Sequence, residues 1–328
     1  MRVLVTGGAG YIGSHTARDL ARAGHDVVIL DDLSTGHPEA IGDLPLARLD
    51  LAAGDVAGFI AEGKFDAVIH FAAKCLVPES VAKPALYWRT NAMGMMRLLD
   101  ALAQHGPRRI VFSSTCATYG LPLRSPIDED HPQKPITSYG RTKLACEHAL
   151  DDYARAYGIG SISLRYFNAA GAAEDGGIGE DHEHETHLIP LMLRAVVTGE
   201  PLRVTGTDYD TPDGTCIRDY VHVMDLAAAH RIALEKIEPG KAQFFNIGTG
   251  KGHSVREVIS TGERVTGRKV PTVEAPRRPG DPPALVAKTD LARSTLGFAP
   301  KFTLEDIVRT AWRWHERHPK GYGRGEGT

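Results

Sequence analysis

A cluster of glycines after the first predicted strand constrains the fold more than any other part of the sequence. Gly7, Gly8, Gly10 and Gly13 directly follow the apolar run 2–6 and open a helical pattern. The G-x-G-x-x-G spacing of the last three is typical of a tight turn that lets a pyrophosphate approach a helix N-terminus and its free N–H groups. The spacing alone arises often by chance, but here it stands at the first strand of a strand–helix–strand unit. The sequence therefore predicts a dinucleotide-binding loop.

Short apolar runs alternate with helical patterns through the first half of the chain. The predicted strands are near-continuous apolar runs, as expected for parallel strands buried on both faces, and they cover residues 2–6, 27–30, 47–50, 67–71, 109–114 and 161–166. Helical patterns cover residues 12–23, 84–104 and 139–157. This alternation predicts an α/β fold with a doubly wound parallel sheet of the Rossmann type.

The length of the chain predicts a second, smaller part. A chain of 328 residues is long enough for about two domains. The regular alternation ends at residues 168–179, where alanine, glycine and acidic residues predict a long loop, and the elements after it are shorter. We therefore expect a nucleotide-binding domain over residues 1–170 and a smaller C-terminal α/β substrate lobe over residues 171–328. The apolar run 244–248 predicts one more sheet strand, so part of about 220–250 is expected to return to the first sheet.

Composition excludes several classes of protein. A net charge of −3 gives no broad positive surface for nucleic acid. No run approaches the ~18 apolar residues that a membrane span needs. The four cysteines show no C-x-x-C spacing, which favours reduced thiols and a cytoplasmic location over a disulfide framework or a zinc knuckle.

An acidic residue marks the expected cofactor. Asp31 ends the second predicted strand, where an acid about 20 residues after the glycines hydrogen-bonds the adenosine ribose and repels a 2′-phosphate. The pattern therefore predicts NAD rather than NADP. For Asp31 and its neighbour Asp32, the structural alternative is a turn or a helix cap.

A tyrosine and a lysine four residues apart form the candidate catalytic pair. Tyr139 and Lys143 open a predicted helix and share one face of it, so both side chains can reach the same point. A phenol is a poor base at neutral pH because its pKa is about 10, but a nearby ammonium or a cationic nicotinamide favours the phenolate. The hydroxyls of residues 113–115 end the fifth predicted strand beside this helix. Alone, the pair could simply support a surface helix; together with the glycine loop and Asp31 it predicts proton transfer.

These motifs and four further stretches resemble the extended short-chain dehydrogenase/reductases, and among them the UDP-glucose 4-epimerases. The stretches are residues 5–15, 164–168, 213–227 and 275–281, and the similarity extends over about residues 1–320. The resemblance implies that Tyr139 is the base, that Lys143 is its electrostatic partner and that the Thr115 hydroxyl binds the sugar. It further implies NAD contacts from Gly7, Gly10, Tyr11, Ile12, Gly13, Asp31, Asp50, Leu51, Phe71, Ala72, Ala73, Asn91, Tyr139, Lys143 and Tyr166.

The second half of the resemblance implies the substrate site. It assigns UDP-sugar contacts to Thr115, Asn168, His187, Leu188, Arg218, Arg278, Asp281 and Leu285. The two arginines suit a diphosphate, because their planar forks bind such oxygens bidentately. The chain departs from the family pattern at three of these positions: Thr115 replaces a serine, His187 an asparagine and Leu285 a bulky tyrosine. Cys75 stands where some members have a lysine that touches the cofactor, and we do not transfer that role to Lys74.

The implied activity is the interconversion of UDP-galactose and UDP-glucose by oxidation at sugar C4, rotation of the 4-keto sugar and re-reduction, in a homodimer. One alternative is a nucleotide-sugar dehydratase, decarboxylase or uronate epimerase. Dehydratases and decarboxylases carry an acid after the strand-five hydroxyl, whereas Cys116 and Ala117 stand here. A second alternative is a non-catalytic NAD-binding sensor, which would not need Tyr139 and Lys143.

A polar loop at residues 181–187 has a metal-like composition. However, H-E-x-x-H fails in both registers, because Thr186 and Leu188 stand where the second histidine should be. We expect no metal here, and instead either a loop that lines the uridine pocket or an exposed polar loop.

Overall fold

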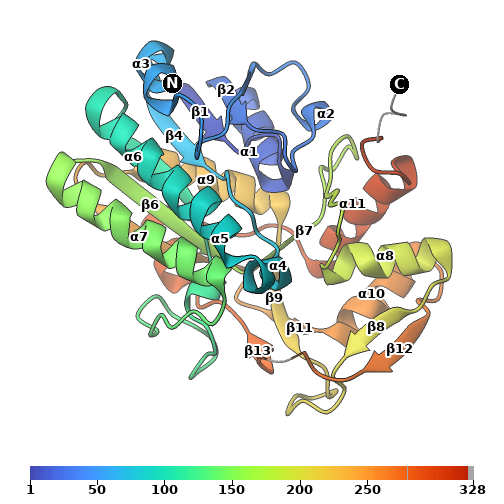
Figure 1. The fold of residues 1–328 in the computed structure, drawn as a ribbon. Coiled ribbons are helices and arrows are strands. Elements are labelled where there is room, and N and C mark those ends of the chain that lie inside the picture. Colours follow the sequence, from blue (N-terminus) through green and yellow to red (C-terminus); the bar gives the residue numbers. More distant parts are fainter. Residues whose placement is uncertain (279, 324–328) are drawn as a thin grey trace.

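Seven parallel strands form the central sheet of the computed structural model, which describes residues 1–278 and 280–323 (Figure 1). The strand order is β10-β6-β5-β4-β1-β2-β3, and every pairing is parallel. The strands are β1 (Arg2–Thr6), β2 (Asp26–Asp31), β3 (Leu46–Arg48), β4 (Ala67–His70), β5 (Arg109–Thr115), β6 (Gly160–Tyr166) and β10 (Ala242–Ile247). With helices on both faces, this sheet confirms the predicted doubly wound fold.

Alternating side chains of the strands build two cores, one on each face of the sheet. Val3 and Val5 of β1 belong to a core shared with α1 and α9, whereas Leu4 belongs to a core shared with α3, α6 and α7. All three side chains are fully buried, as the period of two along a strand requires. The helices around the sheet are α1 (Tyr11–Arg22), α2 (Pro38–Ile41), α3 (Val56–Gly63), α4 (Val77–Ala82), α5 (Pro84–Tyr87), α6 (Gly94–His105), α7 (Ser138–Tyr157) and α9 (Val223–Lys236).

The predicted helix 84–104 is not continuous. It consists of α5, a π-helical segment η1 (Trp88–Met93) and α6. The wider turn includes Asn91, whose side chain is buried and bonds to the chain after β4. Such π-helical turns often occur at functional sites, and Asn91 of this one bonds to Lys74, next to the predicted cofactor contacts 71–73.

The smaller part of the molecule lies beside the carboxyl ends of the sheet strands (Figure 1). Its strand β9 (Ile217–His222) pairs with three others, β7 (Asn168–Ala170), β11 (Gly252–Ser254) and β13 (Ala284–Leu285). A second pair consists of β8 (Leu202–Thr205) and β12 (Thr272–Ala275), and the remaining elements are α8 (Leu188–Thr198), α10 (Val255–Thr266), α11 (Leu304–Arg317) and the short η2 (Cys116–Thr118) and η3 (Ala292–Leu296).

Two local predictions were wrong. The loop predicted for 168–179 begins with strand β7, which pairs in parallel with β9 because its backbone N–H and C=O groups meet an open strand edge there. The strand predicted at 47–50 ends at Arg48. The division of the chain at residue 170 stays a prediction, although β10 and α9 do pack into the first sheet. No helix of the described residues is long and apolar enough to cross a membrane.

A buried ion pair attaches α7, the helix that carries Tyr139 and Lys143, to the sheet. Glu147 of α7 accepts hydrogen bonds from the Arg165 guanidinium of β6, with Nη2 2.7 Å from Oε2 and Nε 2.9 Å from Oε1. The two side chains are 1% and 5% exposed. Ser114 of β5 and Gln133 also donate to the carboxylate, and Arg165 donates to the Tyr119 hydroxyl at 3.0 Å. The polar groups of the pair are therefore satisfied without water.

We predict that Glu147→Gln lowers the free energy of unfolding by about 3 kcal/mol or more, because the substitution leaves the Arg165 charge buried and unpaired. The matched control is Asp151→Asn on the same helix, whose partner Arg155 is exposed. That change should cost less than about 1 kcal/mol. Urea unfolding followed by circular dichroism measures both, and equal losses would contradict the role given to the buried pair.

Candidate active site

The glycine loop after β1 leaves no room for side chains. Gly7 has a φ of 70°, and a Cβ there would stand 2.4 Å from the backbone nitrogen of Ala72. A Cβ on Gly13 would stand 2.2 Å from the Gly7 carbonyl oxygen. Gly10 is the N-cap of α1 and makes no side-chain cap, so the first N–H groups of α1 face outward. This bare helix N-terminus fits the pyrophosphate of a dinucleotide.

Asp31 lies at the carboxyl end of β2, next to the glycine loop. Its carboxylate accepts hydrogen bonds from the N–H groups of Ala9 (3.0 Å) and Leu33 (2.9 Å). Burial raises the pKa of Asp31, while these two bonds lower it. Asp50 is exposed just beyond β3 and its carboxylate accepts the Ala52 N–H, whereas Leu51 is buried in the core beneath α6. Leu51 therefore also has a purely structural reason for its apolar character.

The chain after β4 passes directly beside the glycine loop. The N–H groups of Phe71 and Ala72 both donate to the Thr6 carbonyl, which brings the predicted contacts Phe71, Ala72 and Ala73 to the edge of the cradle. Asn91 holds Lys74, the residue after Ala73, by two hydrogen bonds. Its side chain accepts the Lys74 N–H at 2.9 Å and donates to the Lys74 carbonyl at 3.0 Å. Asn91 therefore holds the loop that faces the cofactor.

The predicted catalytic residues meet at the carboxyl end of β5. The Lys143 ammonium donates to the Ser113 carbonyl at 2.8 Å and lies 4.8 Å from the centre of the Phe112 ring. The Ser113 hydroxyl is 2.6 Å from the Tyr166 hydroxyl. Thr115, Tyr139 and Lys143 are all buried. The structure thus brings together all three residues for which the resemblance implies a catalytic role.

Burial controls the acid–base properties of this group. It raises the pKa of Tyr139 well above its ordinary value, Tyr166 and Cys75 add to the increase, and a hydrogen bond with Thr115 opposes it. Burial also lowers the pKa of Lys143 to about 8. Within the chain the balance of these effects favours the neutral phenol of Tyr139, and an added positive charge beside it would favour the phenolate.

Five of the predicted substrate residues lie on or near β9. Arg218 of β9 forms an ion pair with Asp281 and is paired in register with Leu285 of β13. Asn168 of β7 donates to the Asp219 carbonyl at 3.0 Å. Arg278 is exposed, and its carbonyl accepts the Asp281 N–H at 3.2 Å. Arg218 and Asp281 therefore bind each other here, and one must reorient to bind a ligand.

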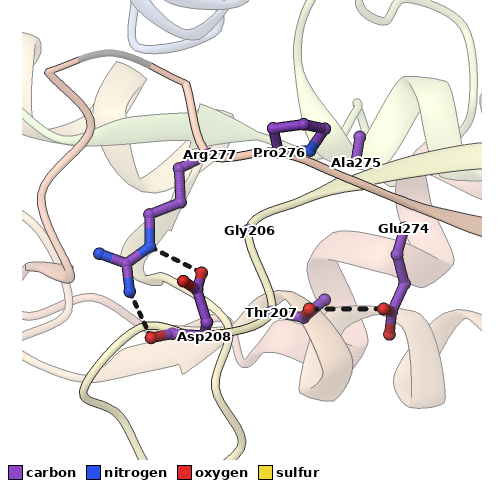
Figure 2. Close-up of a pocket in the computed structure, with 7 residues that line it drawn as sticks. All are labelled: Gly206, Thr207, Asp208, Glu274, Ala275, Pro276 and Arg277. Atoms are coloured by element: carbon purple, nitrogen blue, oxygen red, sulfur yellow. Dashed lines mark hydrogen bonds and ion pairs between the residues drawn. The ribbon is translucent and has the colours of Figure 1, made fainter.

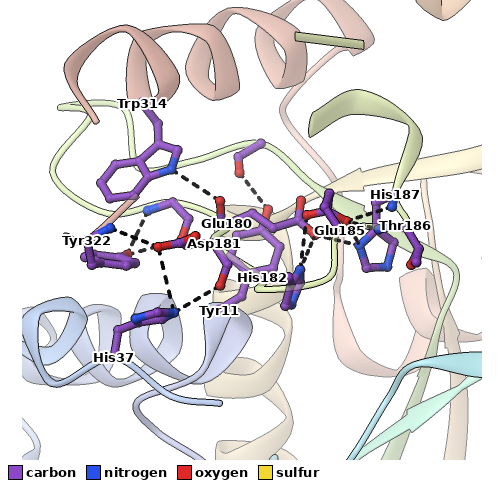
Figure 3. A network of polar contacts seen from close by, with 12 residues as sticks. Tyr11, His37, Glu180, Asp181, His182, Glu185, Thr186, His187, Trp314 and Tyr322 are labelled. Carbon is purple, nitrogen blue, oxygen red and sulfur yellow. Dashed lines mark hydrogen bonds and ion pairs between the residues drawn. The ribbon is translucent and has the colours of Figure 1, made fainter. Parts of the chain in front are cut away.

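His187 and Leu188 lie elsewhere, at the start of α8. His187 is the N-cap of that helix, and Leu188 packs against the core beneath it. Figure 3 shows that the His187 ring points toward Glu180, His182 and Glu185. Glu180 and Glu185 are 5% and 11% exposed, whereas Glu183, His184 and His187 are exposed, so the loop 181–187 is exposed only in part.

A pocket of about 420 Å³ opens at the carboxyl ends of β8 and β12 (Figure 2). Arg277 crosses it and donates to the Asp208 carboxylate at 2.7 Å. The seven lining residues include none of the predicted site residues, although Arg278 is the next residue in the chain. This pocket therefore lies beside the predicted site and is separate from the Tyr139 group.

The sequence reasoning missed several residues that organise the site. Asp219 of β9 is buried and accepts N–H groups from Thr249, Gly250 and Ala287. These hydrogen bonds bring together β9, residues 249–250 and Ala287, which are far apart in the sequence. No local pattern predicts them. Ser113 had a weak signal, since it is one of the run of hydroxyl residues that ends β5.

Comparisons with other proteins agree with this arrangement. Residues 3–248 match the model of the NAD dependent epimerase/dehydratase family. A UDP-glucose 4-epimerase of Lacticaseibacillus casei is 47% identical over 98% of this chain and 99% of its own length. A UDP-glucose 4-epimerase of Corynebacterium glutamicum is 50% identical over 95% of each chain.

Solved structures give the same result. The UDP-glucose 4-epimerase of Brucella ovis in complex with NAD has a TM-score of 0.91 and 49% identity, covering 95% of this chain and 97% of its own. The enzyme of Stenotrophomonas maltophila with bound NAD and formylated UDP-arabinopyranose has a TM-score of 0.93 and 38% identity, covering 98% and 99%. The resemblance inferred from the sequence is confirmed, and the chain belongs to the NAD-dependent epimerase/dehydratase family.

Proposed function

We propose that this protein interconverts UDP-galactose and UDP-glucose at sugar C4, with NAD as a cofactor that it retains. The observation that carries the proposal is the convergence of Thr115, Tyr139 and Lys143 at the end of β5. The group lies on the same edge of the sheet as the glycine cradle. Relatives 47–50% identical over nearly the whole chain are UDP-glucose 4-epimerases.

The residues around the cradle fit NAD. Gly10 caps α1 without a side chain and so leaves this helix N-terminus free for the pyrophosphate, and Asp31 stands where a ribose hydroxyl would be held. When bound, NAD⁺ accepts a hydride from the carbinol carbon, later returns it, and brings a positive charge to the site.

The chain's own residues handle the proton. Tyr139 takes the proton from the sugar 4-hydroxyl as the phenolate, and as the resulting phenol gives one back when the 4-keto sugar is reduced. Thr115, hydrogen-bonded to this phenol, positions the same hydroxyl. Lys143 keeps an ammonium behind the site through its bond to the Ser113 carbonyl. Because these residues are buried, water is kept away from the proton transfer. This favours reduction of the keto sugar in the site over its release.

The substrate half of the proposal rests on Arg218, Arg278, Asp281, Asn168, His187 and Leu188. A UDP diphosphate would draw the Arg218 guanidinium away from Asp281 and release the carboxylate for a ribose hydroxyl. Because the diphosphate stays bound during catalysis, the keto sugar can rotate and present its other face without leaving the site.

The rival sister activities lack support at the end of β5. Dehydratases and decarboxylases need an acid after the strand-five hydroxyl, and burial instead raises the pKa of the Cys116 thiol to about 12. This thiol therefore stays protonated at neutral pH. A non-catalytic NAD sensor would gain nothing from burying Tyr139 and Lys143 together at the cofactor loop.

We also infer a homodimer and a cytoplasmic location. Helices α6 and α7 lie side by side on one outer face of the molecule (Figure 1), and Met93 and Tyr157, near their ends, are 55% and 52% exposed. Two such helices from each copy could form a four-helix contact, and a solution mass near twice 35.5 kDa would support the dimer.

The free thiols, including the exposed Cys75, suit a reducing compartment such as the cytoplasm.

We predict that purified protein converts UDP-galactose to UDP-glucose without added NAD, and that Tyr139→Phe lowers kcat by roughly 10²- to 10⁴-fold, because proton transfer contributes that much. Binding of the UDP-sugar should stay within a few-fold of wild type. The matched control, Tyr157→Phe, removes an exposed phenol from the same helix and should leave kcat unchanged. Obligatory consumption of added NAD with stoichiometric reduction would instead identify a dehydrogenase.

A second prediction concerns Leu285, which packs at the edge of a small core with Cys116 and Phe167, close to the end of β5. As a gate for the sugar 2-substituent, it should permit weak activity on UDP-N-acetylhexosamines. Leu285→Tyr should suppress this activity and Leu285→Ala should raise it, by about 10- to 200-fold in relative kcat/KM.

The control for this series is Leu291→Ala, an exposed leucine outside the core cluster. It should leave the kcat/KM ratio for the two sugar classes unchanged. If Leu285→Ala lowers the melting temperature and leaves the ratio unchanged, Leu285 is only a packing residue.

A further inference from the structure

Four side chains before α8 converge on one another, and of these only His187 stands among the expected substrate contacts. The Nδ1 atom of His182 lies 3.3 Å from Glu180 and 3.2 Å from Glu185. The Nδ1 atom of His187 lies 2.8 Å from Glu180 and 2.9 Å from Glu185. One ligand atom from each residue lies within 4.8 Å of all the others. Figure 3 shows the two rings and the two carboxylates directed at a shared centre.

Hydrogen bonds alone satisfy this arrangement poorly. Each Nδ1 carries one proton or one lone pair, so it can point directly at one acceptor. Yet each Nδ1 here faces two carboxylates at nearly equal distances, and both contacts of His182 exceed the ~2.7–2.9 Å of a charge-assisted bond. A cation at the centre would instead meet one lone pair from each of the four residues.

The spacing suits a tetrahedral ion. Zinc binds histidine nitrogen and carboxylate oxygen at about 2.0–2.1 Å. Neighbouring ligands of a tetrahedron are then about 3.3 Å apart, from the same bond lengths. The His182 contacts of 3.2 and 3.3 Å match that separation, and the His187 ring needs to withdraw by about 0.5 Å to reach it.

Charge and burial agree with a divalent cation. The Glu180 and Glu185 side chains carry two negative charges and are 5% and 11% exposed, which is costly without compensation. A divalent cation with two neutral imidazoles balances these charges as fully as two imidazoliums do. Glu185 is also fixed in place, since its Oε1 accepts the N–H groups of Thr186 and His187 at 2.7 Å.

The cluster lies between the two parts of the molecule. The ring of Tyr11, from the start of α1, meets His182 edge-on at 6.5 Å. Trp314 of α11 donates to the Glu180 carbonyl at 3.3 Å. An ion here would therefore fix the shape of a loop that packs against the cofactor helix and α11.

We propose that Glu180, His182, Glu185 and His187 form a zinc site that holds the start of α8 in place beside the cofactor helix. The four residues have the spacing E-x-H-x-x-E-x-H in the sequence. This pattern differs from the H-E-x-x-H motif, which the sequence does not match. None of its ligands belongs to the proton-transfer group at β5, and only His187 is also an expected substrate contact, so we assign the ion a structural role. The inference does not depend on the proposed function, because its test needs no substrate.

The test is metal analysis of untagged protein, stripped with chelator, incubated with ZnCl₂ and desalted. Wild type should hold about one zinc ion per chain, and cobalt-loaded protein should show the strong visible absorption of tetrahedral Co²⁺. His182→Ala and Glu185→Gln should each reduce bound zinc to below about a tenth of that amount. Zinc should raise the melting temperature of stripped wild type and not of these variants.

The matched controls are His184→Ala and Glu174→Gln, which change exposed residues of the same segment. Both should hold as much zinc as wild type. Should wild type hold less than about a tenth of an ion per chain after loading, the cluster is an ion-pair network and the proposal is wrong. Zinc retained equally by His182→Ala and Glu185→Gln would also overturn it, because the ion would then lie elsewhere.

Discussion

The buried ion pair between Glu147 and Arg165 determines where the catalytic helix lies. Tyr139, Lys143 and Glu147 are four residues apart in turn, so they share one face of α7. Glu147 attaches that face to β6, and Lys143 attaches it to β5 through the Ser113 carbonyl. Because both contacts are buried and α7 is a rigid helix, the Tyr139 phenol cannot shift independently of the sheet. Precise placement of a reacting group is what proton transfer requires.

The same reasoning extends to the substrate side. Strand β9 carries Arg218 toward the predicted diphosphate, and its next residue, Asp219, collects N–H groups from 249–250 and Ala287. Strand β7 follows shortly after β6 and pairs with β9, so the catalytic sheet and the substrate part share a continuous backbone connection. A ligand held at β9 is therefore linked through β7 to β6, the strand that pairs with β5. This explains how one chain can keep a keto sugar bound while its free end turns.

Some of this was predictable from the sequence because local geometry decides it. Gly13 is required by close backbone contacts with Gly7 and Gly8 within a single turn, and Tyr139 and Lys143 follow from helix periodicity. Strand β7 was missed because Asn168–Ala170 has little strand character of its own and becomes a strand only by pairing with β9. The Glu147–Arg165 pair depends on tertiary packing, which no spacing rule reports. Likewise, the high pKa of Tyr139 arises from burial that the motif does not show.

The central claim is that one hydrogen leaves sugar C4 and returns to the same carbon within a single closed site. The most direct test is to incubate the protein with UDP-galactose carrying deuterium at C4, in unlabelled water, and to examine the UDP-glucose by NMR. This account predicts that deuterium stays at C4 of the product, since the hydride is never exchanged with solvent and the protons handled by Tyr139 are those of the hydroxyl. Loss of the label to water, or its appearance at another carbon, would contradict it.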